Sequence, residues 1–310
     1  MSYCHQDDSP SKRRRITSKT CFNAQNSNQI SSKLKSEYHT TLPSNFSTRL
    51  RKWSEKWEIP RKLLHTSIGF ITLYRWIKSN DSPIKLSIWL GKWTSLCVLA
   101  DLTRFRSKRF STFYEYFLGF LMRPTEKSNW NGVIFYLVGV IISLSTLPID
   151  ISVLSILILS WVDTAASVIG RLFGSQGNRL PSPPFARRKS LAGFLGALVM
   201  GTLTSWAFWG TWSGMGLIGR DGYSWKGILN GSSPLNGHRE LFDQSSSIFN
   251  LLKIIRLPNP DSHLSLTTLS IGCGIISALS ESLDLFGWDD NLCLPVLSGW
   301  GIWALMKLMG

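Results

Sequence analysis

Hydrophobic residues are concentrated in seven runs that are separated by polar or basic connectors. The runs cover residues 63–77, 84–102, 133–149, 151–169, 191–212, 268–286 and 292–309. Each is about long enough to cross ~30 Å of hydrocarbon at ~1.5 Å per residue, although the first two are less apolar than the others. A soluble bundle would need polar positions at helical spacing, and residues 133–159 have almost none. The pattern therefore predicts an all-α, polytopic integral membrane helical bundle with about seven transmembrane helices.

Three segments lie outside these runs. Residues 1–54 are polar and basic, and we expect a disordered tail because they cannot bury enough apolar surface to become ordered. Residues 55–310 form the predicted membrane domain, in which residues 213–267 are rich in Gly, Ser, Asn and Pro and are typical of a loop. The aromatic residues 113–122 have basic neighbours on each side and predict a helix that lies on the membrane surface.

The chain carries 34 Lys and Arg against 19 Asp and Glu, and this excess is unevenly distributed. If the seven runs alternate in direction, the chain up to residue 62 and the connectors 104–127, 171–189 and 287–291 share one side. These segments hold 24 of the 34 basic residues. The positive-inside rule then places the tail in the cytosol and residues 213–267 in the lumen. No aromatic-rich nucleic-acid module follows the basic tail, so we expect no nucleic-acid partner.

The residues capable of chemistry lie at the run ends that face the cytosol in this topology. They are Arg61, Lys62 and His65; Asn131 and Gly132; Asp163 to Arg171; Lys189, Ser190 and Gly193; and Glu281, Asp284, Asp289, Asp290 and Asn291. A carboxylate at the end of an apolar run, such as Asp163, is a functional-site candidate by default. Asp163, Gly170 and Gly174 share one helical face, and the alternative is that its small residues pack a neighbouring helix. We expect a shared site at the cytosolic surface.

The candidate residues at this surface include carboxylates that can bind a metal ion and cations that can bind phosphate. Glu281 and Asp284 are i, i+3 neighbours inside an apolar run, and carboxylate oxygens are ligands that Mg²⁺ and Ca²⁺ prefer. Cations followed by Ser190 at the start of a helix are typical of an anion site. This combination indicates phosphoryl or nucleotidyl transfer. The sequence has no Walker A loop, no kinase His-Arg-Asp loop and no zinc-protease motif.

A series of motifs runs through about residues 55–310. They are Ile59-Pro60-Arg61-Lys62-Leu63-Leu64-His65, Asn131-Gly132-Val133, Ser160-Trp161-Val162-Asp163-Thr164-Ala165-Ala166, Ile169-Gly170-Arg171, Lys189-Ser190-Leu191-Ala192-Gly193, Ala278-Leu279-Ser280-Glu281-Ser282-Leu283-Asp284 and Trp288-Asp289-Asp290-Asn291. On these motifs the chain resembles the fungal CTP-dependent diacylglycerol kinases of the endoplasmic reticulum. That family belongs with the dolichol and phytol kinases and the phosphatidate cytidylyltransferases, and the motifs here follow its order.

The resemblance implies transfer of the γ-phosphate of CTP to the hydroxyl of diacylglycerol, which gives phosphatidate and CDP. It implies a multi-pass protein of the endoplasmic reticulum and nuclear membranes, with CTP as the phosphate donor and a divalent cation, Mg²⁺ or Ca²⁺, as cofactor. It also points to four residues that activity requires: Arg61, Lys62, Asp163 and Gly170.

The remaining roles are hypotheses built on that resemblance. The carboxylates expected to hold the metal are Asp163, Glu281, Asp284 and Asp289. The cations expected to neutralise the triphosphate are Arg61, Lys62, Arg171 and Lys189. Gly170 and Gly193 are expected to let the backbone approach it, and His65, Asn131 and Ser190 to contact the substrates. No residue is an obvious general base.

Other functions stay open on the sequence. A dolichol or polyprenol kinase would perform the same chemistry on another alcohol, and a phosphatidate cytidylyltransferase would release pyrophosphate from CTP. A channel or transporter would line an ion path with Asp163 and Glu281, but its acids are expected near mid-bilayer rather than near one surface. We expect CTP, diacylglycerol and membrane lipid as partners, and no protein partner follows from the residues. Neither the acceptor lipid nor the preference for CTP over ATP can be read from them.

Overall fold

The computed structural model describes residues 58–78, 83–119, 121–122, 126, 129–174, 190–212, 224–226, 255–283 and 287–310. Most of these residues are helical, which confirms the all-α prediction. The predicted tail and most of the predicted loop 213–267 lie outside the described residues, as do Lys189 and Asp284.

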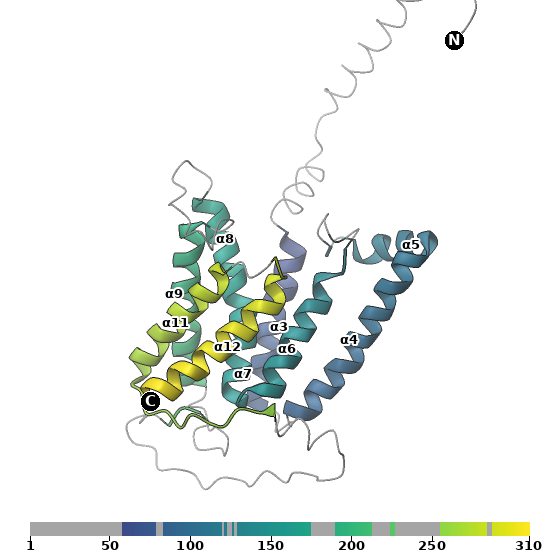
Figure 1. Ribbon diagram of the computed structural model, residues 1–310. Coiled ribbons are helices and arrows are strands. Elements are labelled where there is room, and N and C mark those ends of the chain that lie inside the picture. Colours follow the sequence, from purple (N-terminus) through teal and green to yellow (C-terminus); the bar gives the residue numbers. More distant parts are fainter. Residues whose placement is uncertain are drawn as a thin grey trace, which may run out of the picture. The chain divides into compact units, whose positions relative to one another are not determined.

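Long helical segments occupy all seven apolar runs (Figure 1). In chain order they are α3 (Ile59–Lys78); α4 (Pro83–Arg106); α6 (Gly132–Thr146); one continuous segment made of α7 (Ile149–Leu157), η2 (Ile158–Val162) and α8 (Asp163–Phe173); α9 (Leu191–Ala207) with η3 (Phe208–Trp212); α11 (Leu266–Ser282); and α12 (Asp290–Met309). The helix predicted over residues 113–122 is α5 (Lys108–Leu118), which begins earlier and turns away from the axis of α4.

Three of these segments are long and apolar enough to cross a membrane. They are Ile149–Phe173, Leu191–Thr211 and Asp290–Met309. Helix Gly132–Thr146 is apolar but shorter. The chain is thus a helical membrane protein by the length and composition of these segments, and the count of seven crossings stays a prediction.

The segment Ile149–Phe173 is the centre of the bundle. It contacts α3, α6, α9 and α12, and its residues Leu154, Leu157 and Ile158 have no exposed surface. A helix that is apolar on every side is stable only when neighbours surround it, which explains this position. The π-helical turn Ile158–Val162 lies directly before Asp163, and such turns are frequent at functional sites.

Polar side chains set where several helices begin. Asn131, Ser190, Ser265 and Asp289 are the N-caps of α6, α9, α11 and α12, and the side-chain oxygen of each accepts a backbone N–H of the first turn. Such a cap satisfies a donor that the helix itself leaves unpaired. Three of these caps were predicted to bind substrate or metal, so the structure gives those residues a role in helix formation.

Candidate active site

The predicted site residues that the structure describes lie at one end of the bundle. Figure 1 shows the starts of α3, α6, α9 and α12 at the same end as the C-terminal end of α8. Contacts between distant residues agree with this view: Glu58 pairs with Arg171, and the amide of Asn291 lies 3.5 Å from the carbonyl oxygen of Gly132. We call this end of the bundle the site end.

Glu58 joins two of the predicted phosphate-binding cations, and the sequence analysis missed it. Its carboxylate lies 2.5 Å from the Arg61 guanidinium and 2.6 Å from that of Arg171. Glu58 precedes the first turn of α3, where a negative charge is favourable. An acid three residues before Arg61 was the available signal, but the partner of Glu58 in α8 is 113 residues away.

Lys62 is buried beside this cluster, with 9% of its surface exposed. Its Nζ atom makes no hydrogen bond to any residue that the structure describes. Burial and the Arg171 guanidinium lower the pKa of the Lys62 amine to about 8, against the opposing effect of Glu58 and Asp163. An amine that is short of partners in a buried position is costly, and an anionic ligand would remove that cost.

Glycines bring α8 close to the start of α9. A Cβ atom on Gly170 would lie 3.0 Å from Ser190 Oγ, and one on Gly193 would lie 3.1 Å from the carbonyl oxygen of Ala166. Ser190 Oγ in turn accepts the N–H of Gly193 at 3.2 Å. This close packing supports the alternative interpretation of the small-residue face, and a role of Gly170 toward a phosphate stays a prediction.

A second missed residue, Tyr136, lies against the predicted residue His65. The two rings meet edge to face, with centroids 5.1 Å apart at 83°, and both residues are buried. The Tyr136 hydroxyl is 3.4 Å from Ser160 Oγ on the central helix. A single tyrosine within an apolar run offered little signal, because such residues often have no more than a packing role.

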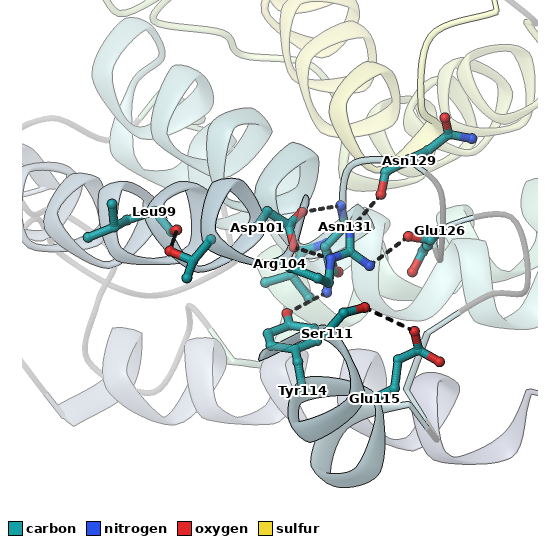
Figure 2. Close-up of polar contacts among 11 residues, drawn as sticks. Leu99, Asp101, Arg104, Ser111, Tyr114, Glu115, Glu126, Asn129 and Asn131 are labelled. Carbon is teal, nitrogen blue, oxygen red and sulfur yellow. Dashed lines mark hydrogen bonds and ion pairs between the residues drawn. The ribbon is translucent and has the colours of Figure 1, made fainter. Parts of the chain in front are cut away.

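Asn131 is engaged in structural contacts. Its Oδ1 accepts the N–H of Val133 at 3.0 Å, and its Nδ2 donates to the Tyr114 hydroxyl at 3.0 Å (Figure 2). Its backbone N–H donates to Asp101 at 2.7 Å. Contact between Asn131 and substrate stays a prediction, whereas the contacts present make it a cap.

The acids expected to hold a cation are distributed over several helix ends. Glu281 is buried near the end of α11, whereas Asp289 Oδ1 accepts the N–H of Asn291 as the cap of α12. Within the described part of the chain, no group of three or more His, Cys, Asp or Glu side chains could hold a metal ion. The described residues alone thus do not form a metal centre, and the metal set stays a prediction.

The fold and these contacts define a class: a helical membrane protein with cations and carboxylates gathered at one end of its bundle. The chain is 36% identical over 252 residues to the CTP-dependent diacylglycerol kinase 1 of Saccharomyces cerevisiae, covering 81% of this chain and 74% of that protein. It is 36% identical over 256 residues to the Schizosaccharomyces pombe protein of the same name, covering 82% and 96%.

A third relative of that name, from Eremothecium gossypii, is 36% identical over 245 residues, covering 78% of this chain and 65% of the relative. The chain belongs to the CTP-dependent diacylglycerol kinase family. No protein-family model and no solved structure matches it.

Proposed function

We propose that the chain is a CTP-dependent diacylglycerol kinase. It transfers the γ-phosphate of CTP to the free hydroxyl of diacylglycerol and so makes phosphatidate and CDP. The observation that carries the proposal is the cluster of Arg61, Lys62 and Arg171 around Glu58, in a chain 36% identical to three enzymes of that name.

The three cations supply the positive charge that a triphosphate requires. Glu58 holds the guanidinium groups of Arg61 and Arg171 on one carboxylate, so these groups are oriented before a ligand arrives. Preorganised cations stabilise the charge of a transferring phosphoryl group without reorganisation. The Lys62 amine has no hydrogen-bond partner among the described residues and is the group that gains most from a phosphate oxygen.

The reaction requires one new bond and one broken bond at the γ-phosphorus. The acceptor oxygen bonds to this phosphorus, the bond to the bridging oxygen of CDP breaks, and the hydroxyl proton is released. A loose transition state places little demand on a base, so catalysis rests mainly on positioning and charge neutralisation. A site at one end of a membrane bundle suits a donor from water and an acceptor whose hydroxyl lies at the lipid surface.

Asp163 acts on Lys62 in this proposal. The carboxylate raises the affinity of the amine for its proton, against the effects of burial and of Arg171. This supports the view that Asp163 helps to keep Lys62 charged for contact with the nucleotide. A divalent cation, Mg²⁺ or Ca²⁺, stays an expectation, and no step here depends on it.

We further propose that the chain lies in the endoplasmic reticulum and nuclear membranes with its N-terminus in the cytosol. The distribution of basic residues supports this orientation, since 24 of 34 lie on the side of the predicted tail. Arg61 and Arg171 belong to that group, so the site end would face the cytosolic supply of CTP.

The test is a transfer assay on the full chain in membranes, with CTP labelled on the γ-phosphate. Diacylglycerol, dolichol and phosphatidate are offered in turn, and ATP replaces CTP in a parallel series. We expect label in phosphatidate when diacylglycerol and CTP are present. Label in dolichyl phosphate alone would assign a polyprenol kinase, and release of pyrophosphate from CTP with phosphatidate would assign a cytidylyltransferase.

A further inference from the structure

A buried ion pair lies at the end of α4, and the proposed reaction does not use it. The Arg104 Nε atom is 3.2 Å from Asp101 Oδ1, and each side chain is 1% exposed. Figure 2 shows the pair between α4, α5 and the segment that leads into α6. Burying two charges is costly unless further hydrogen bonds satisfy them. The other contacts of the pair therefore indicate its role.

The pair holds the backbone that enters α6. Arg104 donates to the carbonyl oxygen of Glu126 at 2.9 Å and to that of Asn129 at 2.7 Å. Asp101 Oδ2 accepts the backbone N–H of Asn131 at 2.7 Å. The planar guanidinium bonds both carbonyls at once, which fixes Glu126 and Asn129 relative to α4 as a single ammonium group could not.

The surface helix α5 is tied to the same point. The Tyr114 hydroxyl accepts from Asn131 Nδ2 at 3.0 Å, and the Arg104 guanidinium lies 5.6 Å from the Tyr114 ring centroid. The position of α5 and the start of α6 are therefore set by one network.

The start of α6 borders the site. A Cβ atom on Gly132 would lie 2.9 Å from Glu126 Oε1 and 3.2 Å from Asn291 Nδ2, so this turn fits closely between its neighbours. One turn further on, Tyr136 contacts His65 and lies near Ser160. A shift of α6 along its axis would carry Tyr136 away from these partners.

We propose that Asp101 and Arg104 are positioning residues of the phosphoryl transfer: they fix the start of α6, so that Tyr136 holds His65 and Ser160 in place near Asp163. Neither residue touches a substrate. The inference rests on the proposed function, because its readout is the rate of that transfer.

The experiment compares Asp101→Asn and Arg104→Lys with the wild type in the full chain. The control is Asp150→Asn, because Asp150 is equally buried but lies at the other end of the central helix, where it bonds Ser224. The rate per folded molecule, equilibrium binding of CTP and thermal unfolding are measured for each. The wild type is first offered diacylglycerol and dolichol, and the variants are assayed with the acceptor that it phosphorylates, so a wrong acceptor does not affect the comparison.

We expect kcat to fall about tenfold or more in both site-end variants, because a small displacement of the reacting groups lowers the rate of transfer strongly. CTP binding should stay within about twofold, since the network does not hold Arg61 or Lys62 on α3. Asp150→Asn should keep its kcat although its unfolding temperature falls.

The proposal is overturned if Arg104→Lys matches the wild type in kcat, or if Asp150→Asn loses as much kcat as the site-end variants. If Asp101→Asn does not fold, Arg104→Lys and the milder Tyr114→Phe decide on the same readouts.

Discussion

Two buried charged residues at opposite ends of the bundle, Asp150 and Lys62, differ in their hydrogen bonds. At the end away from the site, Asp150 has no exposed surface, and its two oxygens accept the N–H and the hydroxyl of Ser224, each at 2.9 Å. Ser224 is itself tied to Ser262, whose N–H donates to its carbonyl oxygen. At the site end, the Lys62 amine is buried with no hydrogen bond from any described residue.

This difference separates a charge with structural partners from one that we propose binds the nucleotide. A carboxylate with its hydrogen bonds filled fixes one conformation, because any movement would leave a buried group unsatisfied. A buried amine without hydrogen-bond partners can form its hydrogen bonds when an anion binds. The Asp101–Arg104 pair shows that buried charges with backbone partners also occur at the site end.

Replacement of Lys62 by Met should have the largest effect on activity. The variant keeps most of the side-chain volume and removes the charge, so transfer from CTP should fall about 100-fold or more, as it does when one preorganised electrostatic group is lost. Stability should stay equal or rise, because a buried charge with few partners is removed. Labelled-CTP transfer and thermal unfolding check both parts, and near-normal transfer would show that Lys62 is an anchor only.

Gly170→Ala should have the next largest effect. The added Cβ meets Ser190 Oγ at 3.0 Å, which pushes the start of α9 away from α8, and we expect about a tenfold loss of kcat. Adding Ser190→Gly removes that contact at a small cost to the helix cap and should restore much of the rate. If the double variant is no better than Gly170→Ala, Gly170 serves the nucleotide directly rather than helix packing.

The pH dependence should report Lys62. Its pKa in the free protein is about 8, below the usual 10.5, so the amine is charged below that pH and neutral above it. The kcat/KM for CTP should therefore decline as the pH rises through about 8.

Glu58 raises the pKa of Lys62, so Glu58→Gln should move the decline to lower pH. It should also raise KM severalfold, because Arg61 and Arg171 lose their shared partner. An alkaline limb that does not move in Glu58→Gln would remove Lys62 as its source.

Asp150→Asn should have the smallest effect on activity and a clear one on stability. One donor of Ser224 loses its acceptor in a buried position, which costs about 1–3 kcal/mol of the free energy of unfolding. Unfolding in detergent should show the loss, with kcat within about twofold of the wild type. Unchanged stability would mean that this end of the bundle is less rigid than its hydrogen bonds imply.

The sequence by itself predicted the helices and the end at which the candidate residues lie. Apolar runs determine helix positions in a membrane protein because a backbone polar group in lipid must be satisfied within its own segment. Arg61, Lys62 and Asp163 are near one another because each lies at a corresponding end of its run. The seven predicted runs are helical, and three of the helices meet the length and apolarity needed for a crossing.

Only the tertiary structure decided which of these residues meet. Glu58 pairs with Arg61 and also with Arg171, which lies 113 positions after Glu58 in the chain. Arg104 donates to the carbonyl oxygens of Glu126 and Asn129, which follow it by 22 and 25 positions. Such contacts depend on the rotation and axial offset of packed helices, which hydropathy does not encode. The π-helical turn before Asp163 changes the rotation of α8 relative to α7, and the fit of Gly170 against Ser190 depends on that rotation. The sequence thus determined the set of residues at the site end, and packing determined their partners.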